Sequence, residues 1–304
     1  MKRNLLLVAI FIQGLLCYAN TDRKIWKLKT GESLSAVLVD YRPETKTVIL
    51  KTDKDEDIAV QQEELNSVDQ EWVVAYLRLT AETQQLVNKL GGTLTSGQST
   101  GNYPTGYHIY RPSTASTGQL LPLMILFHPS GKGDSMISRH IEASEASGFI
   151  TLALDVFRNT SDGEKTEGEF KERFSEVWPF IKANFIFDPS RVFMGGCSGG
   201  AWRAYHYASW FEGPWAGIYA NGGWLGGKKY ENEKYPPLRV AMVNGHQDTA
   251  ANFWVESDRK ILEAKCGGVV KAFAFEGAHQ IPPVIDQIKA FEWLKSTNAE
   301  VKNP

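Results

Sequence analysis

A serine in a glycine-rich turn is the residue of this sequence best suited to nucleophilic chemistry. Residues 195–200 are Gly-Gly-Cys-Ser-Gly-Gly, so Ser198 lies between Gly196 and Gly200 in a Gly-x-Ser-x-Gly arrangement. A short apolar run at 192–194 precedes the turn, and a stretch of helical character follows it. A strand–turn–helix of this kind presents the serine hydroxyl at a helix N-terminus, where free N–H groups favour negative charge. Ser198 is therefore the predicted nucleophile.

Two later residues are suited to activate that serine. A serine hydroxyl reacts readily only when a base takes its proton and a carboxylate orients the base. In enzymes that carry the nucleophilic serine in such a strand–turn–helix, the acid and then the histidine follow the serine along the chain. Asp248 comes after the apolar run 238–243, and His279 is the only histidine after Asp248. We predict Asp248 as the acid and His279 as the base. Asp258, the alternative acid, lies in a predicted helix and is expected to be a solvated surface group.

The other five histidines have less specific interpretations. Three of them are expected to be structural residues of strands or helices: His108, His140 and His206. The remaining two, His128 and His246, are expected at the ends of strands near the site.

The reaction also needs an oxyanion hole, which is usually built from two N–H groups. Gly199, directly after the nucleophile, supplies the first. The second normally comes from the loop after an early strand, here residues 126–133. Pro129 has no N–H, so the donor is expected to be displaced to Ser130 or Gly131.

The first residues predict export. Two basic residues precede an apolar run at 5–16, and small residues follow it, so cleavage is expected before Asn20 with residues 1–19 as a signal peptide. The run is short for a membrane span. A lipid anchor at Cys17 is the alternative, but the bulky Leu16 before it argues against lipidation.

Composition excludes several other classes of protein. The formal net charge is −2 and no basic stripe is present, so a nucleic-acid partner is not expected. Cys197 and Cys266, which remain after cleavage, are too few for a disulfide framework. No cofactor and no metal are expected.

The chain divides into two regions of different pattern. Short alternating strands separated by turns are predicted at 25–29, 34–40, 47–52 and 57–61, and an amphipathic helix covers 70–90. The Gly-, Ser- and Thr-rich residues 91–105 are expected to be a linker. The predicted organisation is a signal peptide at 1–19, a small all-β domain at 20–73, a helix and linker at 74–105, and a larger domain at 106–304.

The larger domain alternates short apolar runs with helical stretches, which predicts an α/β fold: a mostly parallel sheet with helices on both faces. The predicted strands are 107–111, 123–127, 150–154, 192–194, 217–219, 238–243 and 270–275. The predicted helices are 137–147, 167–184, 199–210, 252–265 and 283–295.

Residues 101–296 resemble the α/β-hydrolase esterases, a group that includes feruloyl esterases, acetyl xylan esterases and polyhydroxybutyrate depolymerases. The resemblance rests on the segments Tyr107–Pro112, the strand into His128, Gly196–Gly200, Asn244–Asp248 and Gly277–His279. It implies triad roles for Ser198, Asp248 and His279. Pro129 departs from the pattern of this group at the oxyanion loop.

Residues 24–73 are similar to the Sla homology domain, a small SH3-like barrel. The similarity rests on the Ile25-Trp26 start, the Thr30-Gly31 turn and the Leu65–Trp72 ending. It implies a protein- or surface-binding module, although an exported chain would not meet cytosolic partners.

The combined interpretation is a secreted serine esterase acting on carbohydrate-linked or aryl esters. Four tryptophans are expected in segments at the top of the sheet, either stacking on sugar or aryl rings or serving as core and lid residues: Trp210, Trp215, Trp224 and Trp254. Two alternatives remain open. One is a serine peptidase of the same fold, and the other is a protein-binding protein with a weak or inactive hydrolase domain.

Overall fold

The computed structural model describes residues 24–42, 44–52, 54, 56–155, 163–226 and 233–296. The predicted signal peptide at 1–19, with the alternative anchor Cys17, lies outside the described residues. The chain forms two compact units, Met1–Leu86 and Val87–Pro304. None of the helices in the described ranges combines the length and apolar character needed to cross a membrane.

The smaller unit is a four-stranded antiparallel sheet, as predicted. Its strands follow one another in the order β1 (Lys24–Lys27), β2 (Ser33–Arg42), β3 (Thr47–Thr52) and β4 (Asp57–Gln61). Trp26 is fully buried at its centre, and its indole N–H donates to the Ala36 carbonyl oxygen at 2.9 Å. A 3₁₀ turn, η1 (Gln62–Glu64), leads into helix α2 (Ser67–Leu90).

The start of α2 is tied to the first strand. The Asn66 side-chain oxygen accepts from the Asp69 N–H at 2.8 Å, and a carboxylate oxygen of Asp69 accepts from the Lys27 N–H at 2.7 Å. Asp69 is buried, so these bonds satisfy polar groups that water does not reach. The Leu65–Trp72 segment therefore closes the small sheet by hydrogen bonds as well as by packing.

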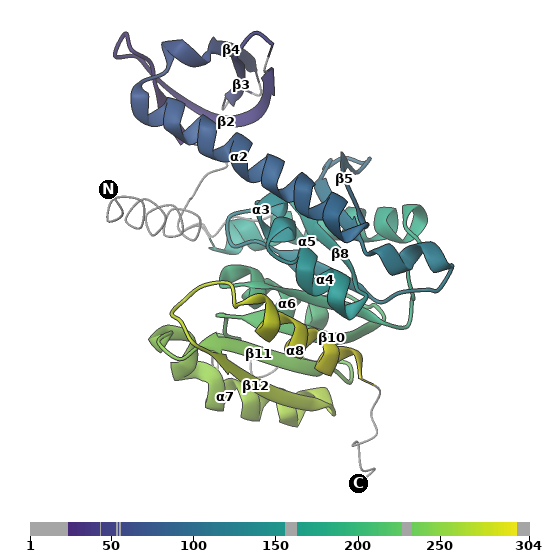
Figure 1. The fold of residues 1–304 in the computed structure, drawn as a ribbon. Helices are drawn as coiled ribbons and strands as arrows, with labels where there is room; N and C mark the ends of the chain where they lie inside the picture. Colours follow the sequence, from purple (N-terminus) through teal and green to yellow (C-terminus); the bar gives the residue numbers. More distant parts are fainter. Residues whose placement is uncertain are drawn as a thin grey trace. The chain divides into compact units, whose positions relative to one another are not determined.

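The larger unit contains an eight-stranded sheet in the order β12-β11-β10-β9-β7-β8-β6-β5 (Figure 1). The six strands from β12 to β8 are parallel, and β6 and β5 are antiparallel additions at one edge. The predicted α/β fold with a mostly parallel sheet is confirmed. The strands are β5 (Thr93–Gln98), β6 (Gly106–Arg111), β7 (Leu123–Phe127), β8 (Ile150–Leu154), β9 (Val192–Cys197), β10 (Trp215–Asn221), β11 (Arg239–Gly245) and β12 (Val269–Phe275).

Alternate residues of β9 show that both faces of the sheet are covered. Val192 and Met194 belong to the core that includes residues of α5, α6 and α7. Phe193 points to the opposite face, where its ring lies 5.3 Å from Phe149, which in turn lies 5.2 Å from Phe291 of α8. This alternation is the period of a strand buried on both sides. The helices are α3 (Gly133–Ser138), α4 (Ile141–Ser147), α5 (Gly163–Asn184), α6 (Gly199–Trp210), α7 (Thr249–Cys266) and α8 (Val284–Lys295).

Two predicted elements are corrected. The linker prediction for 91–105 is wrong in part, because β5 lies within it and pairs with β6 along its whole length. Nearly all β5 side chains are exposed, so this edge strand lacks the apolar alternation that sequence patterns detect. The single helix predicted at 137–147 is two helices. His140 separates them, and its ring Nδ1–H donates to the Met136 carbonyl oxygen at 2.7 Å.

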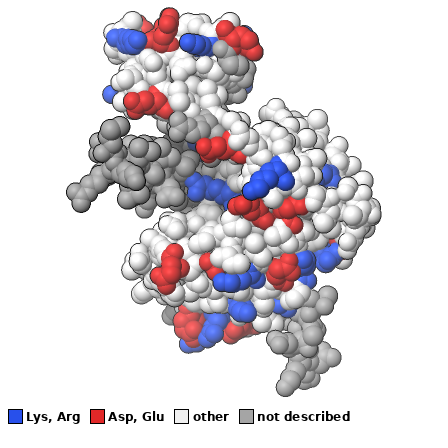
Figure 2. All heavy atoms as spheres, viewed as in Figure 1, with Lys and Arg blue, Asp and Glu red and all other residues white. Residues whose placement is uncertain are grey.

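Charged side chains of both signs are scattered among uncharged residues on one face of the molecule (Figure 2). On the face seen in Figure 2, Lys and Arg lie among Asp and Glu.

Candidate active site

Ser198 occupies a strained turn at the carboxyl end of β9. Its backbone angles are φ 55° and ψ −120°, a region that residues with a side chain rarely adopt. Helix α6 begins at the next residue, so the serine stands at the N-terminal end of a 12-residue helix. A strained backbone persists only where the surrounding structure holds it, and such residues cluster at functional sites.

The two glycines around Ser198 are required by the end of β7. A Cβ atom on Gly196 would lie 2.4 Å from the Phe127 carbonyl oxygen, and one on Gly200 would lie 1.9 Å from the same atom. Both distances are far below van der Waals contact with a rigid backbone atom. The Gly-x-Ser-x-Gly pattern thus packs the turn directly against the strand that leads into the loop at 128–133.

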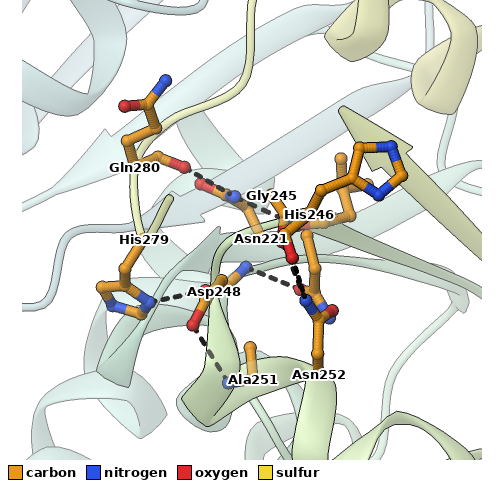
Figure 3. A network of polar contacts seen from close by, with 11 residues as sticks. Asn221, Gly245, His246, Asp248, Ala251, Asn252, His279 and Gln280 are labelled. Carbon is orange, nitrogen blue, oxygen red and sulfur yellow. Dashed lines mark hydrogen bonds and ion pairs between the residues drawn. The ribbon is translucent and has the colours of Figure 1, made fainter. Parts of the chain in front are cut away.

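Asp248 and His279 form a hydrogen-bonded pair, as the sequence predicts. The His279 Nδ1–H donates to a carboxylate oxygen of Asp248 at 2.7 Å, and the other oxygen of Asp248 accepts from the Ala251 N–H at 3.1 Å (Figure 3). Asp248 is the N-cap of α7 and is only 3 % exposed. Because Nδ1 carries the proton, Nε2 is the ring atom with a free lone pair, as a general base requires.

Main-chain hydrogen bonds join the loops that carry this pair. The His246 N–H donates to the Phe275 carbonyl oxygen at 2.9 Å, and the Gln247 N–H donates to the Gly277 carbonyl oxygen at 2.8 Å. The Asn252 side chain donates to the Gly245 carbonyl oxygen at 2.8 Å (Figure 3). The loops after β11 and β12 therefore form one connected structure.

Asn221 links this structure to the serine, and sequence reasoning missed it. Its carbonyl oxygen accepts from the Ser198 N–H at 2.8 Å. Its side-chain amide donates to the carbonyl oxygens of Val243 and Gln280, each at 3.1 Å (Figure 3). Asn221 is fully buried. The available signal was a polar residue at the end of an apolar strand, next to two glycines.

His279 lies close to Gly222, and Ser198 lies close to the next residue, Gly223. A Cβ atom built on Gly222 would lie 3.2 Å from the His279 ring, and one built on Gly223 would lie 2.8 Å from the Ser198 carbonyl oxygen. Gly222 also has a φ of 56°, where glycine is favoured. The Ser198 hydroxyl has no hydrogen-bond partner among the described residues. In free hydrolases the contact between nucleophile and base is often long and tightens with substrate.

The oxyanion loop differs from the prediction. Gly199 is the first residue of α6, where N–H groups have no partner within the helix. The Ser130 N–H, however, donates to the His128 Nδ1 at 3.0 Å, and the Gly131 N–H donates to the His128 carbonyl oxygen at 3.2 Å. Both predicted second donors are thus engaged inside the loop.

Comparison with known proteins identifies the fold. The chain matches no family model and no curated protein, but solved structures match its larger part. The larger unit has the α/β-hydrolase fold. The similar structures include esterase LipW from Mycobacterium marinum (TM-score 0.54, 14 % identity, 72 % of this chain and 85 % of that one). S-formylglutathione hydrolase (FrmB) from Staphylococcus aureus has a TM-score of 0.51 at 12 % identity, over 67 % of this chain and 96 % of that one. FphF, a fluorophosphonate-binding serine hydrolase of Staphylococcus aureus, has a TM-score of 0.51 at 11 % identity, over 68 % of this chain and 99 % of that one.

Two residues of the larger unit do not have the surroundings expected from the sequence. Asp258 is 1 % exposed, so the expectation of a solvated surface group is wrong. One of its oxygens accepts from the Leu225 N–H at 2.6 Å, and burial raises its pKa to about 6. His246 points away from Asp248 (Figure 3), and its exposed ring lies 3.6 Å from Glu276.

The four tryptophans predicted at the top of the sheet have different surroundings. Trp215 is buried at the start of β10, the opposite end of the strand from Ser198, so its top-face expectation is wrong. Trp210 is the last residue of α6, about 18 Å along the helix from its start. Trp224 is half-buried two residues after Gly222, and Trp254 is half-buried in α7 after its N-cap Asp248.

A second polar network supports the oxyanion loop. Asp155, which follows β8, accepts from the Gly133 N–H at 2.7 Å with one oxygen, and its other oxygen lies 3.1 Å from His108 Nε2. The opposite ring nitrogen of His108 lies 2.7 Å from the Ser96 hydroxyl. Burial alone would lower the pKa of His108, but the hydrogen bond and charge of Asp155 raise it overall. No group of three or more potential metal ligands occurs in the described ranges.

Proposed function

We propose that the hydrolase unit is a serine esterase that cleaves carboxylic esters through an acyl-enzyme on Ser198. The observation that carries this proposal is the Asp248–His279 pair at 2.7 Å, placed beside Gly222 next to a serine in a strained turn. The similar structures include an esterase and a fluorophosphonate-binding serine hydrolase, which supports the same class of reaction.

Each residue then has a defined step. The Ser198 Oγ attacks the ester carbonyl carbon while its proton moves to His279 Nε2. Asp248 stabilises the imidazolium through Nδ1. When the tetrahedral intermediate collapses, the ester C–O bond breaks and the leaving oxygen takes the proton from His279. Water then attacks the acyl-serine by the same route, releasing the acid and restoring the Ser198 hydroxyl.

For the substrate we propose carbohydrate-linked or aryl esters. Trp224 supports this choice, because a half-buried indole two residues from Gly222 offers a surface for a sugar or aryl ring. Replacing Trp224 by Ala is expected to raise KM for methyl ferulate more than for methyl acetate, which has no ring to stack. Equal changes for both esters would argue against an aromatic subsite at this residue.

Export and surface binding are further parts of the proposal. Export rests on the basic start and apolar run within residues 1–19. A protein or surface partner for residues 24–73 rests on the motifs of the Sla homology domain and on a small sheet folded around Trp26. Removing residues 20–86, which leaves the larger unit whole, is expected to abolish partner binding and leave ester hydrolysis intact.

A fluorophosphonate probe tests the reaction class. The probe is expected to label the folded protein on the peptide that contains Ser198, and labelling is expected to disappear in Ser198→Ala. The matched control is Ser130→Ala, which keeps the backbone N–H of that residue and should still be labelled. A folded wild-type protein that resists the probe would overturn the proposal.

A further inference from the structure

The loop after β7 leaves few backbone N–H groups for an oxyanion. Pro129 has none, the N–H groups of Ser130 and Gly131 both donate to atoms of His128, and the Gly133 N–H donates to Asp155. An oxyanion hole with the Gly199 N–H alone would be weak, since removing one donor typically slows acyl transfer by about 10²–10³-fold. A side chain of the same loop is a further source of a donor.

The hydrogen bond from Ser130 determines which nitrogen of the His128 ring carries a proton. Because the Ser130 N–H donates to Nδ1, Nδ1 is an acceptor and the proton of the neutral ring lies on Nε2. Burial, with the positive charges of Lys132 and Arg139, lowers the pKa of His128 to about 3, and Asp155 opposes this shift only partly. The ring is therefore a neutral N–H donor at neutral pH.

His128 also directly follows the strand that packs against the turn around Ser198. The preceding residue, Phe127, is paired with Gly196 of β9, and its carbonyl oxygen touches the turn around Ser198. His128 is the first residue beyond β7 and is 8 % exposed. Among the described residues its Nε2 has no hydrogen-bond partner. This nitrogen is not one of the fully buried side-chain atoms that lack a partner, so a ligand can reach it.

We propose that His128 donates its Nε2–H to the oxyanion of the tetrahedral intermediate, replacing the backbone N–H that the loop with Pro129 does not offer. This inference rests on the proposed esterase function. The negative oxygen would then accept from the Gly199 N–H and from His128, and His128 would transfer no proton. A neutral imidazole held in one tautomer is a known means of polarising a carbonyl group. The hydrogen bond from Ser130 gives that tautomer a structural cause.

The decisive variants are His128→Phe, which removes the donor and keeps the ring shape, and His128→Gln, whose amide N–H reaches about as far as Nε2. With p-nitrophenyl acetate, His128→Phe is expected to lower kcat by about 10²–10³-fold with little change in KM. The kcat of His128→Gln is expected to be at least about tenfold higher than that of His128→Phe. His246→Phe, a change at an exposed histidine directed away from Asp248, is the matched control and should keep the wild-type kcat.

A transition-state analogue separates this role from simple support of the loop. A trifluoromethyl ketone adds to the serine hydroxyl and forms an oxyanion, so its inhibition constant should rise in His128→Phe by the same factor as kcat falls. Counting active sites with the fluorophosphonate corrects for any misfolded fraction. A kcat within about twofold of wild type in His128→Phe, or a Gln variant no better than Phe, would overturn the role of His128. An inactive wild-type protein would instead overturn the esterase function.

Discussion

The two sides of Ser198 are built in different ways. On the acid–base side, formed by β10, β11, β12 and the loops after them, hydrogen bonds between loops hold Asp248, His279 and Asn221 together. On the oxyanion side, residues 127–133, the loop bonds mainly to itself through His128 and to its neighbours through Asp155. The first side is assembled from segments far apart in the chain, whereas the second depends on the conformation of one short loop.

This difference indicates which side of the site can change in sequence while the rest of the site keeps its geometry. Several independent bonds fix the acid–base side, so its geometry follows from the fold. In the proposed site a side chain takes the place of a backbone donor, because Pro129 has no N–H and the ring of His128 accepts from the N–H of Ser130. We infer that the catalytic pair is the robust part of the site and the oxyanion loop is the adaptable part.

The largest expected effect is loss of the base. His279→Ala should lower kcat by about 10⁴-fold or more, because the Ser198 proton then has no acceptor. Asp248→Asn should have a similar effect, since an amide at 2.7 Å from Nδ1 no longer selects the correct tautomer. Steady-state hydrolysis of p-nitrophenyl acetate measures both. Near-normal rates in His279→Ala would show that His279 is not the base. His246 would then be the candidate base, and the proposed difference between the two sides of Ser198 would no longer hold.

A smaller effect is expected from the support of the oxyanion loop. Asp155→Ala frees the Gly133 N–H and lets residues 128–133 shift, which should lower kcat by about tenfold to a hundredfold with KM nearly unchanged. Ser96→Ala removes only the far end of the same network and should change kcat less than twofold or so. Asp155 is a positioning residue in this account, and equal effects of the two substitutions would contradict that role.

The smallest effect on catalysis is expected at Asp258, where stability is the quantity to measure. Its folded pKa of about 6 exceeds the ordinary value, so the folded chain binds more protons between about pH 4 and 6. As the pH rises from about 4 to 6, the free energy of unfolding of the wild type should therefore fall by about 3 kcal/mol relative to that of Asp258→Asn. Urea unfolding of both proteins at pH 4 and pH 8 measures the difference. Glu263→Gln, at an exposed position of the same helix, is the control and should show no such trend.

Much of the acid–base side could be predicted from the sequence. The order of Ser198, Asp248 and His279 left few other assignments, and the apolar runs before them indicated strands that end at one edge. Asn221 could not be found in this way, because its two amide bonds go to residues 22 and 59 positions away. Such contacts depend on strand order and register, which residue patterns do not specify.

The errors have similar causes. Ser130 and Gly131 were reasonable donors by position, but the direction of an N–H depends on loop torsions. The helical position of Asp258 was predicted correctly, while its burial depends on the segment that contains Leu225. Trp215 lies two residues before the predicted strand 217–219, and which end of the observed strand β10 faces the site follows only from the pairing with β9.

Trapping the acyl-enzyme tests the central claim most directly. The protein is mixed with p-nitrophenyl acetate, quenched with acid within milliseconds and digested for mass spectrometry, with Ser198→Ala treated in parallel. The account predicts one acetyl group per active site on the peptide that contains Ser198, formed with a burst of p-nitrophenol and absent from the variant. Rapid turnover without an acetylated Ser198, or acetylation at another residue that persists in Ser198→Ala, would contradict it.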